Sequence, residues 1–184
     1  MVTSYLQLLS KRYKDQLDDD ANEFIYYAVD GSNRMRVLIN SLLEYSRVNR
    51  VKPFEEINTK NLLKNVLQDL NDQIIESKTT IKTNALSNIY GDPVLISRLF
   101  LNLITNAIKF RSTKKPQITI SCEKKKNECL FSVKDNGIGI QKEYQEKVFV
   151  IFQRLHSKEK YPGTGIGLAI CKKIVERHNG KMWI

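Results

Sequence analysis

The sequence predicts an α+β fold in which a helical hairpin precedes a mixed sheet packed on helices. Apolar residues recur at helical spacing through residues 1–49, and helix and strand patterns alternate from residue 59 onward. A proline-containing stretch of mixed charge separates the two regions. We therefore expect a hairpin at 1–50, a linker at 51–58 and a separate domain at 59–184, and the hydrophobic content of 41% is enough for a globular core.

The N-terminal region carries two helical stripes of apolar residues, at 1–17 and 20–49. In the second stripe Ala28, Met35 and Leu42 recur every seven residues. A repeat of seven is typical of helices that pair with a second copy, so the pattern predicts a dimerising hairpin. Packing of the hairpin on its own domain would give the same periodicity, and both interpretations stay open.

The second region is expected to begin with two helices and a strand. Thr59 is expected to cap a helix from Lys60 to about Glu76, and a strand follows at 79–84. Asp92 followed by Pro93 predicts the start of a second helix, running to about Phe110, because proline is favoured in the first turn.

The remaining elements alternate in the same way. Two strands at 117–123 and 128–135 are expected to form an antiparallel hairpin. Residues 141–162 lack sustained periodicity and predict an irregular loop with one short helix. The last helix should run from Ile166 to about His178, and Asn179 and Gly180 should end it before a strand that starts at 182–184. These last elements are read from turn and cap residues.

Composition restricts the class of protein. The net charge of +10 favours anionic partners, but the basic residues are scattered and predict a solvated surface rather than a nucleic-acid face. The three cysteines, Cys122, Cys129 and Cys171, form no C-x-x-C pair, so they indicate neither a disulfide framework nor a zinc site. With no apolar run near ~18 residues and no signal peptide, we expect a cytoplasmic chain without a membrane segment.

One face of the helix at 93–110 is polar. Asn102 and Asn106 lie four residues apart and Lys109 three further on, so the three share a face. An amide oxygen is a suitable ligand for magnesium riding on phosphates, and the lysine supplies a charge for a phosphate. The alternative is that the asparagines hydrogen-bond locally within the helix.

Two glycine-bearing segments follow. In DNGIGI, Asp135 ends a strand, where its carboxylate could accept a hydrogen bond from the exocyclic amine of adenine; an ordinary turn is the alternative. Further on, Gly163, Gly165 and Gly167 spell G-x-G-x-G, which is neither the dinucleotide nor the P-loop pattern. This run can leave amide N–H groups free at a helix N-terminus to bind a phosphate, or be a flexible turn.

The order of these segments supports a resemblance. Residues 102–110, 135–140, 148–156 and 163–180 resemble, in family order, the N, G1, F and G2 boxes of sensor histidine kinases, within the Bergerat-fold ATPase superfamily. The resemblance covers 59–184 as the catalytic ATP-binding domain, an α/β sandwich. Residues 1–50 resemble the later part of the dimerisation and histidine-phosphotransfer hairpin. The amino-acid sequence is most similar to those of phytochrome-like and multi-sensor kinases.

The resemblance implies a role for each matching residue on the polar helix and the strand-end turn. Asn106 resembles the magnesium ligand, with Asn102 supporting the same site and Lys109 contacting phosphates or ribose. Phe110 would pack near the base, and Asp135 resembles the aspartate that reads the adenine amine. ATP and Mg²⁺ are therefore the expected cofactors.

The resemblance also implies roles for the loop residues. The loop at 141–162 resembles the family's lid over the nucleotide. Glycines before it would shape the base pocket, and residues at the end of the lid would surround the phosphates. The pocket residues are Gly137 and Gly139, and the lid-end residues are Gly163, Thr164, Gly165, Gly167 and Leu168. Phe149 and Phe152 would anchor the lid, and Arg154 would approach the γ-phosphate or the phosphotransfer hairpin.

Asn102 distinguishes transfer from hydrolysis. Hydrolytic relatives resemble this helix but place a glutamate there as general base, and an asparagine cannot take a proton. The resemblance therefore implies a kinase that presents the γ-phosphate to a histidine, with a homodimer partner, upstream sensor domains and a response regulator. Neither His156 nor His178 matches the histidine that accepts the phosphoryl group in the family. In the family that histidine lies in a segment just before the part that corresponds to Met1 of this chain. We expect a kinase portion that does not label itself; a non-catalytic ATP-binding or dimerising module is the alternative.

Overall fold

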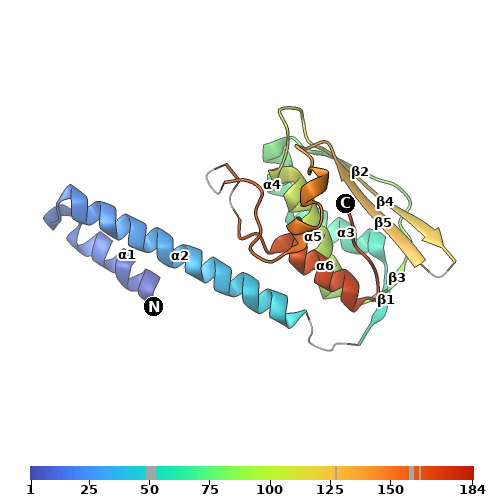
Figure 1. Ribbon diagram of the computed structural model, residues 1–184, viewed down its shortest axis with the longest axis horizontal. Helices are drawn as coiled ribbons and strands as arrows, with labels where there is room; N and C mark the ends of the chain where they lie inside the picture. Colours follow the sequence, from blue (N-terminus) through green and yellow to red (C-terminus); the bar gives the residue numbers. More distant parts are fainter. Residues whose placement is uncertain (49–52, 127, 158–159, 162) are drawn as a thin grey trace. The chain divides into compact units, whose positions relative to one another are not determined.

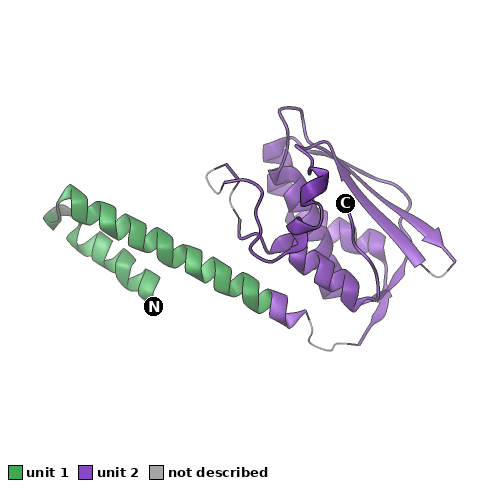
Figure 2. Cartoon of the chain, viewed as in Figure 1, with its two compact units in different colours: residues 1–44 green, residues 45–184 purple. Residues whose placement is uncertain are grey.

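The computed structural model describes residues 1–48, 53–126, 128–157, 160–161 and 163–184. The chain divides into two compact units, Met1–Glu44 and Tyr45–Ile184, which Figure 2 colours separately. Each unit is described by itself below.

Unit 1 is a pair of helices, as predicted. Helix α1 spans Val2–Tyr13, a short 3-10 turn η1 spans Lys14–Gln16, and helix α2 spans Asp19–Arg47, so its last turn belongs to unit 2. The hydroxyl groups of Thr3 and Ser32 lie 2.6 Å apart and join the two helices. Ser32 is the only buried side chain among those described in unit 1.

Unit 2 contains a mixed three-stranded sheet. Strand β2 (Thr80–Thr83) pairs in parallel with β4 (Gln117–Lys125), and β4 pairs antiparallel with β5 (Glu128–Asp135). Along β4, Ile118 and Ile120 are buried, which places the core on one face of the sheet. Figure 1 shows the helices of the unit packed on that side. The strands predicted at 79–84, 117–123 and 128–135 are confirmed.

Besides the last turn of α2, the described part of unit 2 contains four α-helices: α3 (Thr59–Asp69), α4 (Asn71–Ser77), α5 (Pro93–Lys109) and α6 (Gly167–Arg177). The single helix predicted over 60–76 is wrong, because the chain breaks at Leu70 (φ −97°, ψ 5°), whose side chain is buried in the core. The cap is also one residue earlier than predicted. Asn58 accepts from the Asn61 N–H, while the Thr59 hydroxyl donates to the Ser87 carbonyl.

Two short strands were not predicted. Strand β1 (Glu55–Ile57) pairs antiparallel with β3 (Ile89–Gly91), so the linker expected at 51–58 includes a strand; residues 51 and 52 lie outside the described residues. In the expected loop at 141–162, two 3-10 turns form instead of one helix, η2 (Lys142–Tyr144) and η3 (Lys147–Phe149). Residues 181–184 form no strand, contrary to the prediction.

The end of α6 is held by His178. Its Nε2 accepts from the backbone N–H of Asp92 at 3.0 Å, so the ring is neutral at that nitrogen, and Nδ1 lies 2.7 Å from the Ile174 carbonyl. Phe54 stacks on the ring, with centroids 4.6 Å apart. His178 therefore caps a carbonyl of the last turn. The helix ends as predicted, with Asn179 in the left-handed region (φ 58°).

Candidate functional site

Helix α5 separates a core face from a polar face. Asp92 caps it by accepting from the N–H groups of Val94 and Leu95 at 3.0 and 3.2 Å, with Pro93 at the first position. The apolar residues at one face are buried: Ile96, Phe100, Ile104, Ala107 and Ile108. Burial of that stripe fixes the rotation of the helix and leaves the predicted polar residues on another face.

The two asparagines of the polar face meet the start of α6. A Cβ built on Gly167 would lie 3.9 Å from Asn102 Oδ1 and 3.9 Å from Asn106 Nδ2. The Nδ2 atom of Asn102 is buried, and no hydrogen-bond partner was found for it among the described residues. Local hydrogen bonding therefore does not account for the Asn102 amide, and the structure brings together Asn102, Asn106 and Gly167.

Lys109 meets the other end of the glycine run. A Cβ on Gly163 would lie 2.8 Å from Lys109 Nζ, so the end of the lysine side chain would have to move aside, and the φ of 149° at Gly163 disfavours residues other than glycine. Burial lowers the pKa of Lys109, and the nearby charge of Arg154 lowers this pKa further. Two cations thus gather at the glycine run, an arrangement suited to a polyphosphate.

The Asp135 turn packs against the end of α5. Asp135 Oδ1 accepts from the Gly137 N–H at 2.8 Å, and the Ile138 N–H donates to the Phe110 carbonyl at 3.0 Å. A Cβ on Gly137 would lie 2.4 Å from that carbonyl, which requires glycine. Gly139 adopts a left-handed φ of 71°. The predicted adenine-reading carboxylate and Phe110 are therefore neighbours, and the Asp135 side chain is exposed to a ligand.

The lid residues close on Phe110 through aromatic rings. The ring centroids of Tyr161 and His156 lie 5.0 and 6.1 Å from that of Phe110, and Arg154 Nη2 donates to the Tyr161 carbonyl at 2.9 Å. Sequence reasoning missed Tyr161, although an aromatic residue just before the glycine run was a usable signal.

The predicted lid anchors fit only in part. Phe149 is half-buried, with Lys172 Nζ 5.4 Å from its ring centroid. The anchoring role expected of Phe152 does not fit its exposure of 48% or its left-handed φ of 64°. Val148 is buried in its place. Gly165 (φ 74°) packs on Arg154, and Thr164 and Leu168 lie half-buried beside it.

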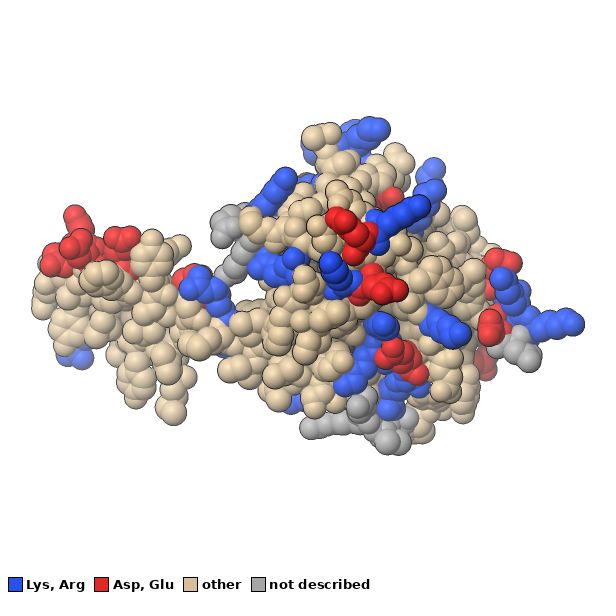
Figure 3. Space-filling model, in the orientation of Figure 1, with Lys and Arg blue, Asp and Glu red and all other residues tan. Residues whose placement is uncertain are grey.

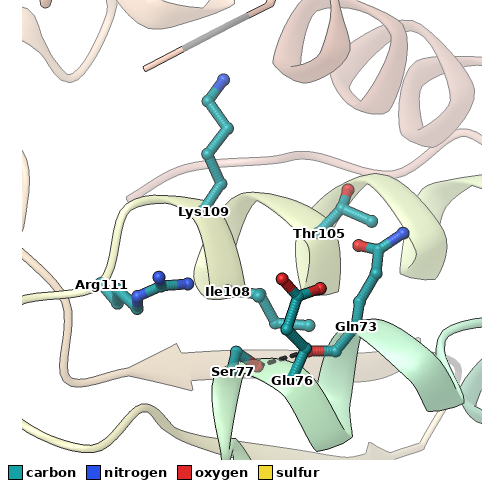
Figure 4. Close-up of a pocket in the computed structure, with 7 residues that line it drawn as sticks. All are labelled: Gln73, Glu76, Ser77, Thr105, Ile108, Lys109 and Arg111. Carbon is teal, nitrogen blue, oxygen red and sulfur yellow. Dashed lines mark hydrogen bonds between the residues drawn. The ribbon is translucent and has the colours of Figure 1, made fainter. Parts of the chain in front are cut away.

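A hollow lies between α4 and α5. It has a volume of about 300 Å³ and includes Gln73, Glu76 and Arg111 in its lining. Of the predicted site residues it contains only Lys109, whose side chain extends away from Glu76 in Figure 4. The hollow is therefore distinct from the cluster around Gly167.

The surface charge of unit 2 is mixed. Figure 3 shows Lys and Arg spread over the visible face of this unit with Asp and Glu among them. No helix among the described residues is long and apolar enough to cross a membrane.

The fold and the converging loops define the class of protein, an ATPase domain. The chain belongs to the "Histidine kinase-, DNA gyrase B-, and HSP90-like ATPase" family, whose model matches residues 91–184. It is 47% identical over its whole length to cyanobacterial phytochrome A from Nostoc sp., but it spans only 24% of that protein, so it covers about a quarter of such relatives.

Solved structures of histidine kinases match the fold of this chain. The catalytic domain of histidine kinase ThkA matches with a TM-score of 0.61 and 29% identity, covering 72% of this chain and 88% of that one. ThkA in complex with the response regulator protein TrrA matches with a TM-score of 0.67 and 26% identity, covering 98% and 52%. The chain therefore contains an ATPase domain of the histidine kinase type, as the sequence resemblance implied.

The residues present fit a magnesium ion. The side-chain amides of Asn102, through Oδ1, and of Asn106, through Nδ2, face a glycine whose lack of a side chain leaves room beside them. Amide oxygens are hard ligands, and magnesium needs few from the protein when it rides on phosphates. Among the described residues no three His, Cys, Asp or Glu side chains gather as a metal site.

Proposed function

We propose that this chain is the ATP-binding catalytic portion of a two-component sensor histidine kinase. It holds Mg-ATP between α5, the Asp135 turn and the glycine run, and it presents the γ-phosphate to a histidine on the dimerisation helix. That histidine is neither His156 nor His178, and the phosphoryl group passes onward to an aspartate of a response regulator.

The convergence on α5 carries this proposal. Segments separated by many residues bring a carboxylate, two amides and two cations around one helix end, as described above. A carboxylate beside Phe110 suits the exocyclic amine of adenine, while Lys109 and Arg154 lie at the glycine run, where phosphates would bind. The distribution of charge thus matches a nucleotide, with base and phosphate ends distinct.

Each residue has a defined task in this proposal. Asn106, supported by Asn102, holds the magnesium ion, which offsets negative charge on the phosphates when bound. Lys109 binds phosphate or ribose oxygens, and Arg154 approaches the γ-phosphate or the phosphotransfer hairpin. The lid-end residues Gly163, Thr164, Gly165, Gly167 and Leu168 enclose the phosphates, while Gly137 and Gly139 shape the base pocket.

The chemistry favoured is transfer rather than hydrolysis. A general base must accept a proton from water, and the Asn102 amide has no such capacity. The protein would therefore orient ATP and exclude a competing reaction while the histidine acts as nucleophile.

We do not expect this chain to label its own histidines. Both ring nitrogens of His178 are engaged, one by the Asp92 N–H and one by the Ile174 carbonyl. His156 lies in the lid region against Phe110 and Tyr161. Neither ring lies on a helix of unit 1, where the family carries its acceptor.

The partners proposed follow from the relatives. The complex of ThkA with TrrA supports a response regulator receiver domain as partner. The apolar hairpin supports a homodimer, and the phytochrome relative supports upstream sensor domains in the whole protein. We propose a cytoplasmic location and no nucleic-acid partner.

Incubation with labelled ATP tests the proposal. The purified chain should bind Mg-ATP in preference to Mg-GTP and remain unlabelled, and it should label an acceptor histidine supplied on a separate hairpin chain. Binding without transfer would favour the alternative, a non-catalytic module that modulates a partner kinase. Absence of ATP binding would exclude both.

A further inference from the structure

Asn136 directly follows Asp135, and its side chain holds this turn to another part of the chain. Asn136 Oδ1 accepts from the Gln117 N–H at 2.8 Å, and Nδ2 donates to the Lys115 carbonyl at 2.9 Å. A backbone N–H can only donate and a carbonyl can only accept, so the two partners fix the orientation of the amide. The Ser112 hydroxyl also donates to the Asn136 carbonyl at 3.1 Å. Three hydrogen bonds therefore join Asn136 to the segment that follows α5.

The Asn136 side chain extends the pairing of β4 beyond the end of β5. The last residue pair of the two strands is Ile118 with Asp135. One step further along β4, the Pro116 carbonyl points toward β2, where it accepts from the Thr80 N–H at 2.9 Å. Backbone groups alternate in direction along a strand, so the groups on either side of Pro116 point toward β5. The Asn136 amide meets both of them, which fixes Asp135 as the residue at which β5 leaves the sheet.

The Asp135 carboxylate is oriented by the turn that begins at this point. Its Oδ1 accepts from the Gly137 N–H at 2.8 Å, and no partner for Oδ2 was found among the described residues, so Oδ2 is the oxygen left for a ligand. On the far side of the turn, the Ile138 N–H donates to the Phe110 carbonyl at 3.0 Å. The turn is thus fastened on both sides, and on the near side the fastening is a side chain that a substitution can remove.

We propose that Asn136 is a positioning residue, which holds the Asp135 carboxylate where it accepts from the exocyclic amine of adenine. Both ends of the Asn136 amide are occupied by backbone groups, so it acts through Asp135 and not on the nucleotide. The inference rests on the proposed function, since the orientation of the carboxylate matters only if a base binds beside it. A hydrogen bond weakens steeply when its angle or distance departs from the preferred values, so a small displacement of the turn would weaken the contact with the amine.

A purely structural role, joining the ends of two strands, is the alternative. Lys115 and Gln117 are exposed and Asn136 is half-exposed, so water can replace the bonds that Asn136→Ala removes, and stability should change little. A weaker joint between the strands would affect all bound nucleotides alike. A positioning role instead predicts a loss confined to nucleotides that carry the amine.

The first measurement needs no nucleotide. Hydrogen exchange of the Gly137 backbone amide, which donates to Asp135, is followed by NMR in the full chain. We expect exchange at least about tenfold faster in Asn136→Ala than in the wild type, and Asp135→Ala provides the rate of a turn without its carboxylate. Exchange at the wild-type rate in Asn136→Ala would overturn the inference, whatever the chain binds.

The second measurement separates positioning from a structural role. Calorimetry compares Mg-ATP with the magnesium complex of purine riboside triphosphate, which lacks the exocyclic amine. The wild type should prefer ATP by about tenfold or more, because the amine donates to a carboxylate. In Asn136→Ala this preference should fall to about twofold or less, with little change in affinity for the amine-free nucleotide. An unchanged preference, or equal losses for both nucleotides, would contradict the inference.

Asn88→Ala is the matched control, because it removes another exposed amide of unit 2, whose Nδ2 donates to Glu56 at 3.1 Å. It should leave the exchange rate and both affinities unchanged. If Asn136→Ala does not fold, Asn136→Ser takes its place with the same expected outcomes, since a serine side chain is too short to bridge both backbone groups. A wild type that binds neither nucleotide, or both equally, would count against the proposed function, while Gly137 exchange would still judge whether Asn136 holds the turn.

Discussion

The two units of the chain differ in the solvent exposure of their apolar side chains. In unit 2, Ile104 and Ile120 are 0% exposed within a continuous core. In unit 1, Phe24 is 70% and Met35 58% exposed, and only Ser32 is buried among the described side chains. A helical pair of 44 residues with its apolar groups in water lacks the burial that supports independent folding. Unit 2 therefore carries its own stability, whereas unit 1 needs another surface.

The largest expected effect tests the core of unit 2. Ile104→Ala should lower the free energy of unfolding by about 2–5 kcal/mol, because it removes buried methyl groups and leaves a cavity. Urea denaturation followed by far-UV circular dichroism measures this.

The same substitution at an exposed site serves as the control. Ile75 on α4 is 65% exposed, so Ile75→Ala should stay within about 0.5 kcal/mol of the wild type. Similar losses from both variants would mean that the core of unit 2 is not organised as described.

The next effect locates nucleotide binding in unit 2. Asp135→Asn should weaken Mg-ATP binding by about 10- to 100-fold, because the carboxylate is replaced by an amide that pairs poorly with the adenine amine. Calorimetric titration measures the loss, and Glu128→Gln at the far end of β5 provides the control with the same change of charge. Binding that survives Asp135→Asn would place the base elsewhere.

A smaller effect tests the hairpin. Met35 and Leu42 are exposed and seven residues apart on α2. If their row faces a second chain, replacing both by Glu should raise the dimer dissociation constant more than about tenfold, because two charges would be buried in each copy. Analytical ultracentrifugation measures the dissociation constant.

Asn33→Glu combined with Asn40→Glu adds the same charge with the same spacing on a different face of α2. This pair should leave association nearly unchanged. Equal effects from the two pairs would favour the other interpretation of the seven-residue pattern, and Mg-ATP affinity should be unchanged in both.

Local signals made much of the site predictable. Asp92, Pro93 and the apolar stripe of α5 lie close together in sequence, so the start and rotation of the helix, and the shared face of Asn102 and Asn106, could be derived. Strands β1 and β3 have three residues each, too few for a period of two to emerge. These two strands form because they pair with each other across the fold, and such pairing depends on tertiary contacts rather than on local sequence.

Other features depend on distant partners. The contact of His178 with Asp92 joins residues 86 apart, and no local pattern marks it. The Thr59 cap was wrong for a similar reason, because the hydroxyl of Thr59 is taken by Ser87 and Asn58 caps instead. Adjacent polar residues offer equal local signals, and the partner across the fold decides between them.

The smallest effect is a pH dependence that only unit 2 should show. Because burial and Arg154 lower the pKa of Lys109 below its usual 10.5, the folded chain releases this proton at lower pH than the unfolded chain does. The cost of burying the cation is therefore fully present below the lowered pKa and disappears as pH rises from that pKa to the unfolded value of 10.5. Bound polyphosphate favours the charged amine, so Mg-ATP affinity should be greatest below the lowered pKa.

Above that pKa, affinity should fall with rising pH, by at most about tenfold per pH unit for one proton. Lys109→Arg keeps its charge throughout this range, so its affinity should stay flat while that of the wild type falls. Calorimetry across neutral and alkaline pH compares the two, and identical profiles would assign the proton to another group. Since the hairpin row of Met35 and Leu42 carries no titratable group, dimerisation through it should not follow the same curve, which keeps the two units distinct in their response to pH.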